Sequence, residues 1–375
     1  MDPDNSLFSI HFSQLEDPRI DRKKLHSLVD IVGISVCAVI AGADSWTDVA
    51  LFGKSREKWL RTFLSLKNGI PSHDTFGRVF SLLDPEEFQK CFAGWVRAVH
   101  ERVQGVVAID GKTVRRSHDR RKGRQAIHVV NAWATQSGIA LAQKKVDAKS
   151  NEIGAIPELL SLLRIKGCLV TIDAMGCQRE IAQAINGAGA DYLLAVKDNQ
   201  PTLREDVEQE FRLAQQNGFA LMDHQYFETV EKDHGRIEQR KYWITQDVQG
   251  IGTGEKWPNL AAMAMCRAMR TVNGQTSTED RFFITSRKSA DAEGIAAAIR
   301  AHWRVENSLH WVLDVAFNED QSRVRAGHAA ENLALIRKLA LNAIRASTSK
   351  KGGIKAKRLQ AAWDNDYLTE ILMAL

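Results

Sequence analysis

Two aspartates in the sequence each follow a short apolar run that is typical of a buried strand. Asp110 follows residues 106–109, and Asp173 follows residues 168–172. Acids at the ends of neighbouring strands in an α/β sheet lie at the edge where ligands bind. Carboxylate oxygens are the ligands that Mg²⁺ prefers, and the ion keeps water molecules for its substrate. The two aspartates are therefore predicted to share a divalent cation.

A third carboxylate on a helix would complete such a site. His302, Glu306, His310 and Asp314 recur every four residues, which places them on one slowly drifting helix face. Glu306 lies among aromatic and apolar neighbours, where an unpaired carboxylate would be costly. The alternative is a surface acid paired with a neighbouring arginine. As a metal ligand, Glu306 would allow two ions to clamp both oxygens of a phosphodiester exchange.

A basic segment begins directly after the first aspartate. Seven of the thirteen residues from 112 to 124 are Lys or Arg, with Asp119 as the one acid, although the net charge of the chain is only +5. A charge run is most often a solvated loop. Its position next to a candidate metal ligand favours contact with phosphates, each of which would add to the salt dependence of binding. Lys112 and Arg115, with Arg116 beside them, are expected nearest the scissile phosphate.

The elements that position these residues fall into three predicted regions. Residues 1–104 are predicted to be helical, and the break at residues 69–74 fits either a helix-turn-helix or an ordinary helical hairpin. Residues 105–346 alternate strands and helices as a mixed α/β sheet does, with a β-rich insertion at about 198–280 and long helices at 290–315 and 329–345. Residues 347–375 are predicted to be a basic linker and a C-terminal helix.

The composition indicates a protein of the cytoplasm. The five cysteines are scattered and show no paired C-x-x-C spacing, which favours a reducing compartment and argues against a cysteine zinc site. The first residues are acidic and do not form a signal peptide. The most apolar stretch, residues 28–43, is shorter than the roughly 20 residues of a membrane span. We therefore expect a buried core helix there and no membrane partner.

Several motifs in order resemble those of the insertion-sequence DDE transposases. The strand-end segments are "AIDGKTVRRS" and "TIDAMGCQ", and the helical segment is "HWRVENSLHWVLDVAFNEDQSRVR". The likeness extends upstream to "GIPSHDTFGRVF" and downstream to "NLALIRKLALN", so it covers nearly the whole chain. The most similar group is the one that includes the H-repeat-associated proteins.

This resemblance implies an RNase H-like catalytic core with a DDE triad, which would be Asp110, Asp173 and Glu306. It also implies a helical N-terminal DNA-binding domain and a β-rich insertion before the glutamate helix. The triad would hold two Mg²⁺ ions, for which Mn²⁺ can substitute. The implied activity is cleavage at transposon ends and transfer of the 3′-hydroxyl into target DNA. The implied assembly is a homodimer or higher oligomer, associated with the nucleoid when bound to DNA.

The sequence departs from many relatives around the glutamate. Where those relatives carry tyrosine, arginine and lysine at fixed offsets, this chain carries Ile299, His302 and Leu313. Contacts to DNA must then come from other residues. The candidates are Arg300, Arg304, Arg323 and Arg325. We expect His302, Asn307 and His310 to contact Glu306 and orient it as a metal ligand.

Three other functions stay open on the sequence. A nuclease on the same core would cut without strand transfer and would need the same metals. A catalytically silent DNA-binding relative would lack cleavage, although all three acids are present. A zinc hydrolase could use His302, Glu306 and His310, but their spacing is not the His-Glu-x-x-His of zinc proteases.

Overall fold

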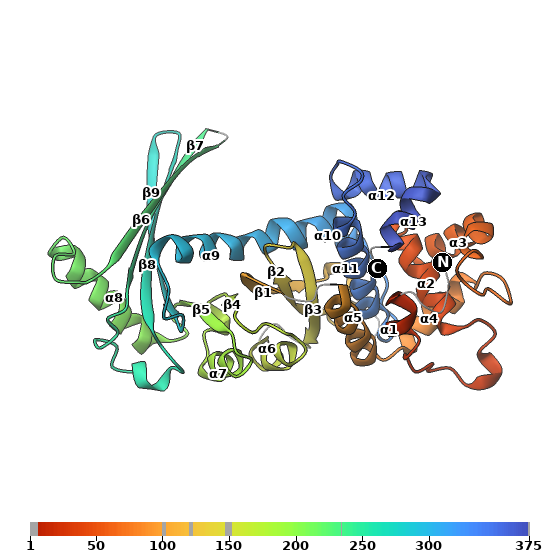
Figure 1. The fold of residues 1–375 in the computed structure, drawn as a ribbon, viewed down its shortest axis with the longest axis horizontal. Helices are drawn as coiled ribbons and strands as arrows, with labels where there is room; N and C mark the ends of the chain where they lie inside the picture. Colours follow the sequence, from red (N-terminus) through yellow and green to blue (C-terminus); the bar gives the residue numbers. More distant parts are fainter. Residues whose placement is uncertain (1–6, 100–102, 120–122, 147–151, 234, 374–375) are drawn as a thin grey trace.

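The computed structural model describes residues 7–99, 103–119, 123–146, 152–233 and 235–373. The molecule is elongated (Figure 1). A helical bundle lies at one end, a region of long β-strands lies at the other, and the central sheet joins them. The long helix α9, Ala292–Val305, runs between the two ends.

The bundle is built from both ends of the chain. Its central helix is α2, which is buried along nearly its whole length and is capped by the Ser27 side chain. Three C-terminal helices pack against it, so residues 354–373 form two helices of the bundle after a short connection. The helices are α1 (Leu7–Phe12), α2 (Leu28–Ile40), α3 (Trp46–Leu60), α4 (His73–Leu82), α5 (Pro85–Val99), α11 (Ala329–Ala346), α12 (Ile354–Trp363) and α13 (Asn365–Met373).

The central sheet is mixed, as the sequence predicts. Its strands lie in the order β3-β2-β1-β4-β5, with β1 antiparallel to β2 and parallel to β4. In the parallel pair, Ile109 of β1 stands opposite Ile172 of β4. The strands are β1 (Val106–Thr113), β2 (His128–Ala134), β3 (Ile139–Val146), β4 (Leu169–Ile172) and β5 (Asp191–Val196).

The insertion extends this sheet to nine strands. Strand β9 pairs antiparallel with β5, and β8, β7 and β6 follow outward, so the insertion is continuous with the core. The sequence reading missed helix α8, Pro201–Gln216, at its start. Leu203, Val207 and Phe211 form the buried side of that helix at a spacing of four residues. The insertion strands are β6 (Gln225–Asp233), β7 (Arg236–Thr245), β8 (Ala262–Val272) and β9 (Gln275–Thr285).

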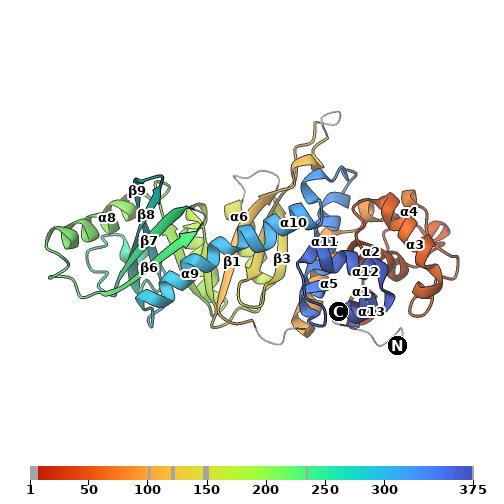
Figure 2. The ribbon, with the colours of Figure 1, turned by 90° about the horizontal axis from the view of Figure 1, so that it is seen from above.

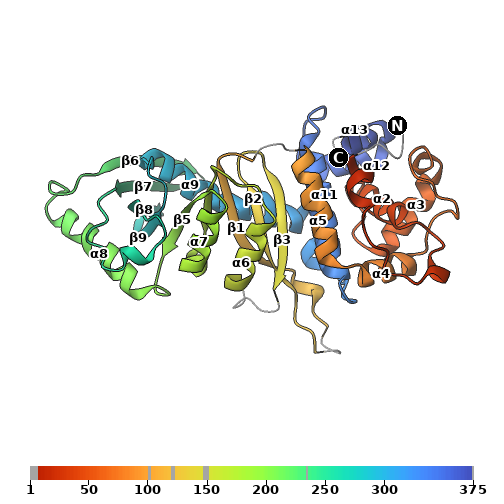
Figure 3. The ribbon, with the colours of Figure 1, turned by 60° about the horizontal axis from the view of Figure 1, so that its bottom comes forward.

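Helices cover the central sheet. Helices α6 (Glu152–Ser161) and α7 (Arg179–Gly187) lie in front of the strands in Figure 3, and α9 passes behind them. Figure 2 shows α9 crossing β1 on its way to the bundle. The sequence predicts one helix over 290–315, but the structure interrupts it with a π-helical turn at Glu306–His310 before α10, Trp311–Ala316. None of the helices in the described segments is both long and apolar enough to cross a membrane.

Candidate active site

The two strand aspartates are neighbours because of the register of β1 and β4. The parallel pairing ends at Ile109 of β1 and Ile172 of β4. The next residues are Asp110 and Asp173, respectively. Adjacent strands lie about 4.8 Å apart, so the two acids project from the same end of the pair. Strand β1 itself continues to Thr113 along β2, whereas the sequence predicts that it ends at residue 109. Asp110 is therefore held by strand pairing on both sides of its position.

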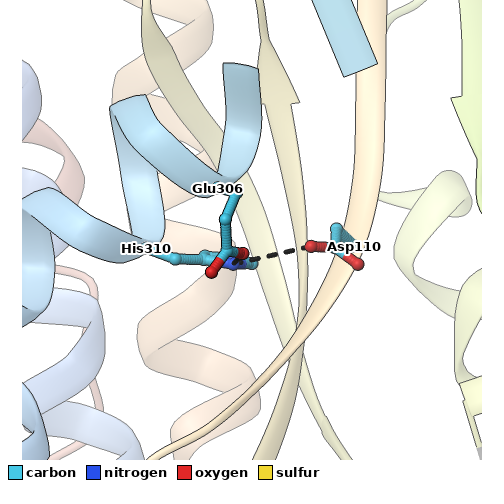
Figure 4. A group of neighbouring side chains, drawn as sticks. All are labelled: Asp110, Glu306 and His310. Carbon is cyan, nitrogen blue, oxygen red and sulfur yellow. Dashed lines mark hydrogen bonds and ion pairs between the residues drawn. The ribbon is translucent and has the colours of Figure 1, made fainter. Parts of the chain in front are cut away.

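Glu306 and His310 reach Asp110 from the helix that crosses the sheet (Figure 4). His310 Nδ1 lies 2.9 Å from Glu306 Oε2 and 3.5 Å from Asp110 Oδ2. One potential ligand atom from each of these three residues lies within 4.8 Å of the others. The side chain of His310 is buried, whereas that of Glu306 is 67% exposed. The π-helical turn between the two residues is a feature that often marks functional sites.

Asp173 and His302 border the same cavity, whose volume is about 530 Å³. Asp173 accepts backbone N–H bonds from Met175 at 3.1 Å and Gly176 at 3.4 Å, which fix its carboxylate. It lies outside the 4.8 Å cluster, which gains His310 instead. His302 Nδ1 lies 3.1 Å from the Thr171 hydroxyl on β4, so this histidine connects the helix to the strand that ends in Asp173.

The electrostatics of the cavity suit a cation. Burial raises the pKa of Asp110 to about 7, and the charges of Asp173 and Glu306 add to the effect. Burial also lowers the pKa of His302 and of His310, which favours neutral imidazoles that can accept or ligate. Within the described residues, the side chain that contacts both Asp110 and Glu306 is the His310 imidazole, and neither acid forms an ion pair with Lys or Arg. Two carboxylates and an imidazole with unbalanced negative charge fit a divalent ion.

Lys112 is placed differently from the sequence expectation. Its side chain is 8% exposed, and its ammonium lies 2.6 Å from Asp314, 3.6 Å from Asp320 and 3.7 Å from Glu319. The alternation of β1 turns it towards the glutamate helix, on the same side as Asp110. Its charge is therefore committed to these carboxylates and not offered to a phosphate. Arg115 forms an ion pair with Asp320 at 3.2 Å, but its side chain is 80% exposed and stays accessible at the surface.

The other arginines divide into paired and unpaired side chains. Arg300 contacts both oxygens of Glu231 at 2.9 Å and lines a second cavity, together with Asn307. Asn307 therefore lines a neighbouring cavity and not the one that Asp110 and Glu306 line. Arg304 and Arg323 are exposed, and the Arg325 guanidinium donates to the backbone carbonyl of Arg116 at 3.0 Å. Arg323 and Arg325 line a groove of about 790 Å³ between the connection 318–326 and helix α4.

Sequence reasoning missed a buried pair behind Asp110. His128 on β2 contacts Glu152 at the start of α6, and its Nδ1 lies 2.8 Å from the Thr113 hydroxyl. A Cβ atom on Gly111 would lie 2.5 Å from both Glu152 Oε1 and His128 Nε2. The glycine directly after Asp110 was the available signal, because a strand glycine often marks the close approach of another group.

The fold and the acid cluster define an RNase H-like enzyme core with a helical region before it and a β insertion within it. Comparison with known families agrees. Residues 101–343 match the family model described as "Transposase DDE domain", and residues 9–96 match the one described as "DDE_Tnp_1-associated". The chain belongs to the DDE transposase family of insertion sequences.

Relatives align over almost the full chain. The protein YncI of Escherichia coli O157:H7 is 44% identical over 96% of this chain and 93% of its own length. The H repeat-associated protein YhhI of E. coli strain K12 is 41% identical over 96% of each. A cryo-EM structure of the piggyBac transposase synaptic complex with hairpin DNA covers 98% of this chain and 76% of its own, with 9% identity and a TM-score of 0.44.

Proposed function

We propose that this protein is a DNA transposase that cleaves a phosphodiester at each end of its element and joins the freed 3′-hydroxyl to target DNA. The observation that supports this most is the convergence of Asp110, Asp173 and Glu306 on one cavity in a chain of the DDE transposase family. The three acids come from β1, the end of β4 and the helix that crosses the sheet.

The three acids would hold two Mg²⁺ ions, or Mn²⁺ in their place. When bound, such ions polarise the scissile phosphate and lower the pKa of the attacking water. Asp110 would be the central ligand, since the charges of Asp173 and Glu306 both raise its pKa. His310 would fix the rotation of the Glu306 carboxylate through its 2.9 Å contact. Asp173 would present a carboxylate already anchored by two backbone N–H groups.

The residues of the site fit a direct phosphoryl transfer, without a covalent intermediate on the protein. Water and then a 3′-hydroxyl would attack phosphorus in line, so the protein needs to position and neutralise charge and needs no Ser or Tyr nucleophile. Exposed arginines outside the cavity would neutralise the DNA backbone, namely Arg115, Arg116, Arg304 and Arg323. The joining of two element ends requires at least a dimer in the active complex, and we place that complex in the cytoplasm, on the nucleoid.

The test uses purified full-length protein, Mg²⁺ and a plasmid that carries the flanking DNA of the gene. We expect strand-transfer products with the unchanged protein. Asp110→Asn and Glu306→Gln should each lower cleavage by more than about a hundredfold, because a direct ligand matters more than a group behind it. The matched control is Asp198→Asn, an exposed acid that lines the same cavity and pairs with Arg204.

Each other result selects a different function. Hydrolysis without joined products would support a nuclease on the same core. Binding without cleavage would support a silent DNA-binding relative. Full cleavage by Asp110→Asn would refute the assignment of the acids.

A further inference from the structure

Two contacts join β1 to the helix that crosses it. They follow one another in the same order along the strand and along the helix. Asp110 faces Glu306 and His310, and Lys112, two residues further along β1, faces Asp314, four residues further along the helix. Two residues of a strand span about 6.6 Å. Four residues of an α-helix span about 6 Å. The strand and the helix therefore stay in step from the first contact to the second.

The second contact is also largely buried. Lys112 is 8% exposed and lies 2.6 Å from Asp314. Glu319, which is 1% exposed, and Asp320 complete its surroundings. A buried ammonium among carboxylates tolerates little displacement, because separating the partners leaves a charge without compensation. This contact is therefore stiff compared with an ion pair at the surface.

The helix is interrupted at the segment that carries Glu306 and His310, so a stiff Lys112–Asp314 contact matters for the position of these two residues. The π-helical turn covers Glu306–His310, the segment that carries both groups facing Asp110. On its N-terminal side, His302 contacts Thr171 of β4 at 3.1 Å. On its C-terminal side, Asp314 contacts Lys112 of β1. A turn whose hydrogen bonds depart from the α pattern is thus held against the sheet at both ends.

We propose that Lys112 is a positioning residue: its ion pair with Asp314 sets the position of the glutamate helix on β1, so that Glu306 and His310 meet Asp110. This rests on the proposed function, because it assumes that these groups hold the metal. Lys112 acts through the helix and does not touch the reacting atoms.

The direction in which metal affinity changes distinguishes positioning by Lys112 from a simple effect of its charge. If Lys112 acted only as a nearby positive charge, its removal would strengthen the binding of a divalent cation, and removal of the Asp314 charge would weaken it. If the pair positions the helix, removal of either partner weakens binding. Loss of a supporting partner typically costs 10–100-fold in metal affinity, so we expect about tenfold for each.

The experiment titrates Mn²⁺ alone into the full-length protein without DNA and follows free Mn²⁺ by electron paramagnetic resonance. The variants are Lys112→Met, Asp314→Asn and the conservative Lys112→Arg. Asp314→Asn is included because its side chain is 30% exposed and the amide keeps its shape, so this variant is expected to fold even if Lys112→Met does not. The matched control is Lys144→Met, which removes a β3 lysine held by Glu86 at 2.9 Å and Glu158 at 2.7 Å.

We expect weaker Mn²⁺ binding in both Lys112→Met and Asp314→Asn, and near-normal binding in Lys112→Arg and Lys144→Met. Binding by Lys112→Met that equals or exceeds that of the unchanged protein would overturn the proposal, as would normal binding by Asp314→Asn. The Asp110→Asn variant distinguishes failure of the positioning role from failure of the metal assignment. If it loses Mn²⁺ while the Lys112 variants do not, only the positioning role fails. If it keeps Mn²⁺ at full strength, the metal assignment fails and the positioning role fails with it.

Discussion

At the scale of single residues, Asp110 is where the requirements of folding and of chemistry oppose each other. Burial raises its pKa to about 7, and the charges of Asp173, Glu306 and Glu152 add to the shift. In the absence of a cation, the folded state must therefore either protonate this group or hold an unfavourable charge. A site that holds such a charge ready for a metal gains function at the expense of stability.

Asp110→Asn should stabilise the metal-free protein at pH 8. The folded-state pKa lies above the unfolded value of roughly 3.9, so the folded state binds the extra proton between the two pKa values, and its stability falls as the pH rises through that window. Because the side chain is 26% exposed, we expect a gain of roughly 2 kcal/mol in the unfolding free energy, less than the full shift implies.

Chemical denaturation in EDTA measures this gain. The difference between the two proteins should narrow as the pH is lowered from 8 towards 4. A variant no more stable than the unchanged protein at pH 8 would show that the Asp110 charge is well compensated without metal.

His310→Ala should weaken Mn²⁺ binding by about 10–100-fold, the range expected when a group that orients a ligand is lost. The imidazole contacts both Asp110 and Glu306, so its removal frees two side chains at once. Calorimetric titration provides the measurement. The control is Asn307→Ala, since Asn307 lies on the same π-helical turn but lines the neighbouring cavity. Equal losses in both variants would point to general damage to the turn.

Residue types and spacing indicated that Asp110, Asp173 and Glu306 share one site, but not which side chains surround them. An apolar run leads into each of Asp110 and Asp173, and the register of β1 and β4 places both where the parallel pairing ends. The partners of Lys112 lie some 200 residues away in the chain, at Asp314 and Glu319. No local pattern distinguishes a lysine that will be buried among distant carboxylates from one that will be solvated. Lys112 was therefore expected at the DNA when its structural environment is the interior.

At the scale of elements, strand β1 carries the site on one side and a packed helix on the other. Asp110 and Lys112 point to the crossing helix, and Gly111 between them faces His128 and Glu152. The position of β1 is thus set from both sides at a residue next to the acid. A small displacement of this strand would move Asp110 with it.

Gly111→Ala should therefore impair both stability and metal binding. The added Cβ would lie 2.5 Å from Glu152 Oε1 and from His128 Nε2, which are buried and cannot simply rotate away. We expect a loss of about 1–3 kcal/mol, as for other overpacked sites. Thermal denaturation and Mn²⁺ titration measure the two effects.

The control for this substitution is Gly154→Ala in α6, where nothing lies within 4 Å of the new Cβ. Alanine is the better helix former by about 0.8–1 kcal/mol, so this variant should be at least as stable as the unchanged protein. If Gly111→Ala behaves in the same way as the control, the close packing behind Asp110 is unimportant.

The strands of the sheet were more predictable than the helices around it. Alternating and β-branched runs indicated the central strands and the return of 281–285 to the core, which β9 confirms. Helix α8 was missed because its sequence is mostly polar and its apolar residues are few. The π-helical turn was invisible for a different reason. The contacts on its two sides come from β4 and β1, and the spacing of the helix residues contains no sign of them.

At the scale of the whole molecule, the elongated shape separates the exposed arginines from one another. Arg323 lies in the groove beside the helical bundle, and within the described chain no carboxylate pairs with it. Arg300 lies next to the insertion strands and is already neutralised by Glu231. Arginines with the same formal charge are thus expected to contribute unequally to DNA binding.

Arg323→Ala should reduce the slope of log binding constant against log salt concentration by about 0.9, the value for one phosphate contact on duplex DNA. Arg300→Ala is the control and should change that slope by much less, because its charge is already paired. Fluorescence anisotropy over a range of NaCl concentrations measures both. Equal slopes for the two variants would place the DNA backbone away from the groove that Arg323 lines.

The path of the chain through the sheet also has a consequence for the order of synthesis. Strands β1, β4 and β5 leave the ribosome before the insertion, with Asp110 in β1 and Asp173 directly after β4, and all four insertion strands follow before Glu306. Domains fold from the N-terminus as they emerge. A nascent chain therefore carries two acids without the third until the insertion is complete. Arg358, whose guanidinium binds the backbone carbonyls of Val39, Ala43 and Ala316, arrives later still. If the protein cuts DNA as proposed, we expect the nascent chain to be inactive until Glu306 has been translated, and a chain released before that point to lack the complete acid site.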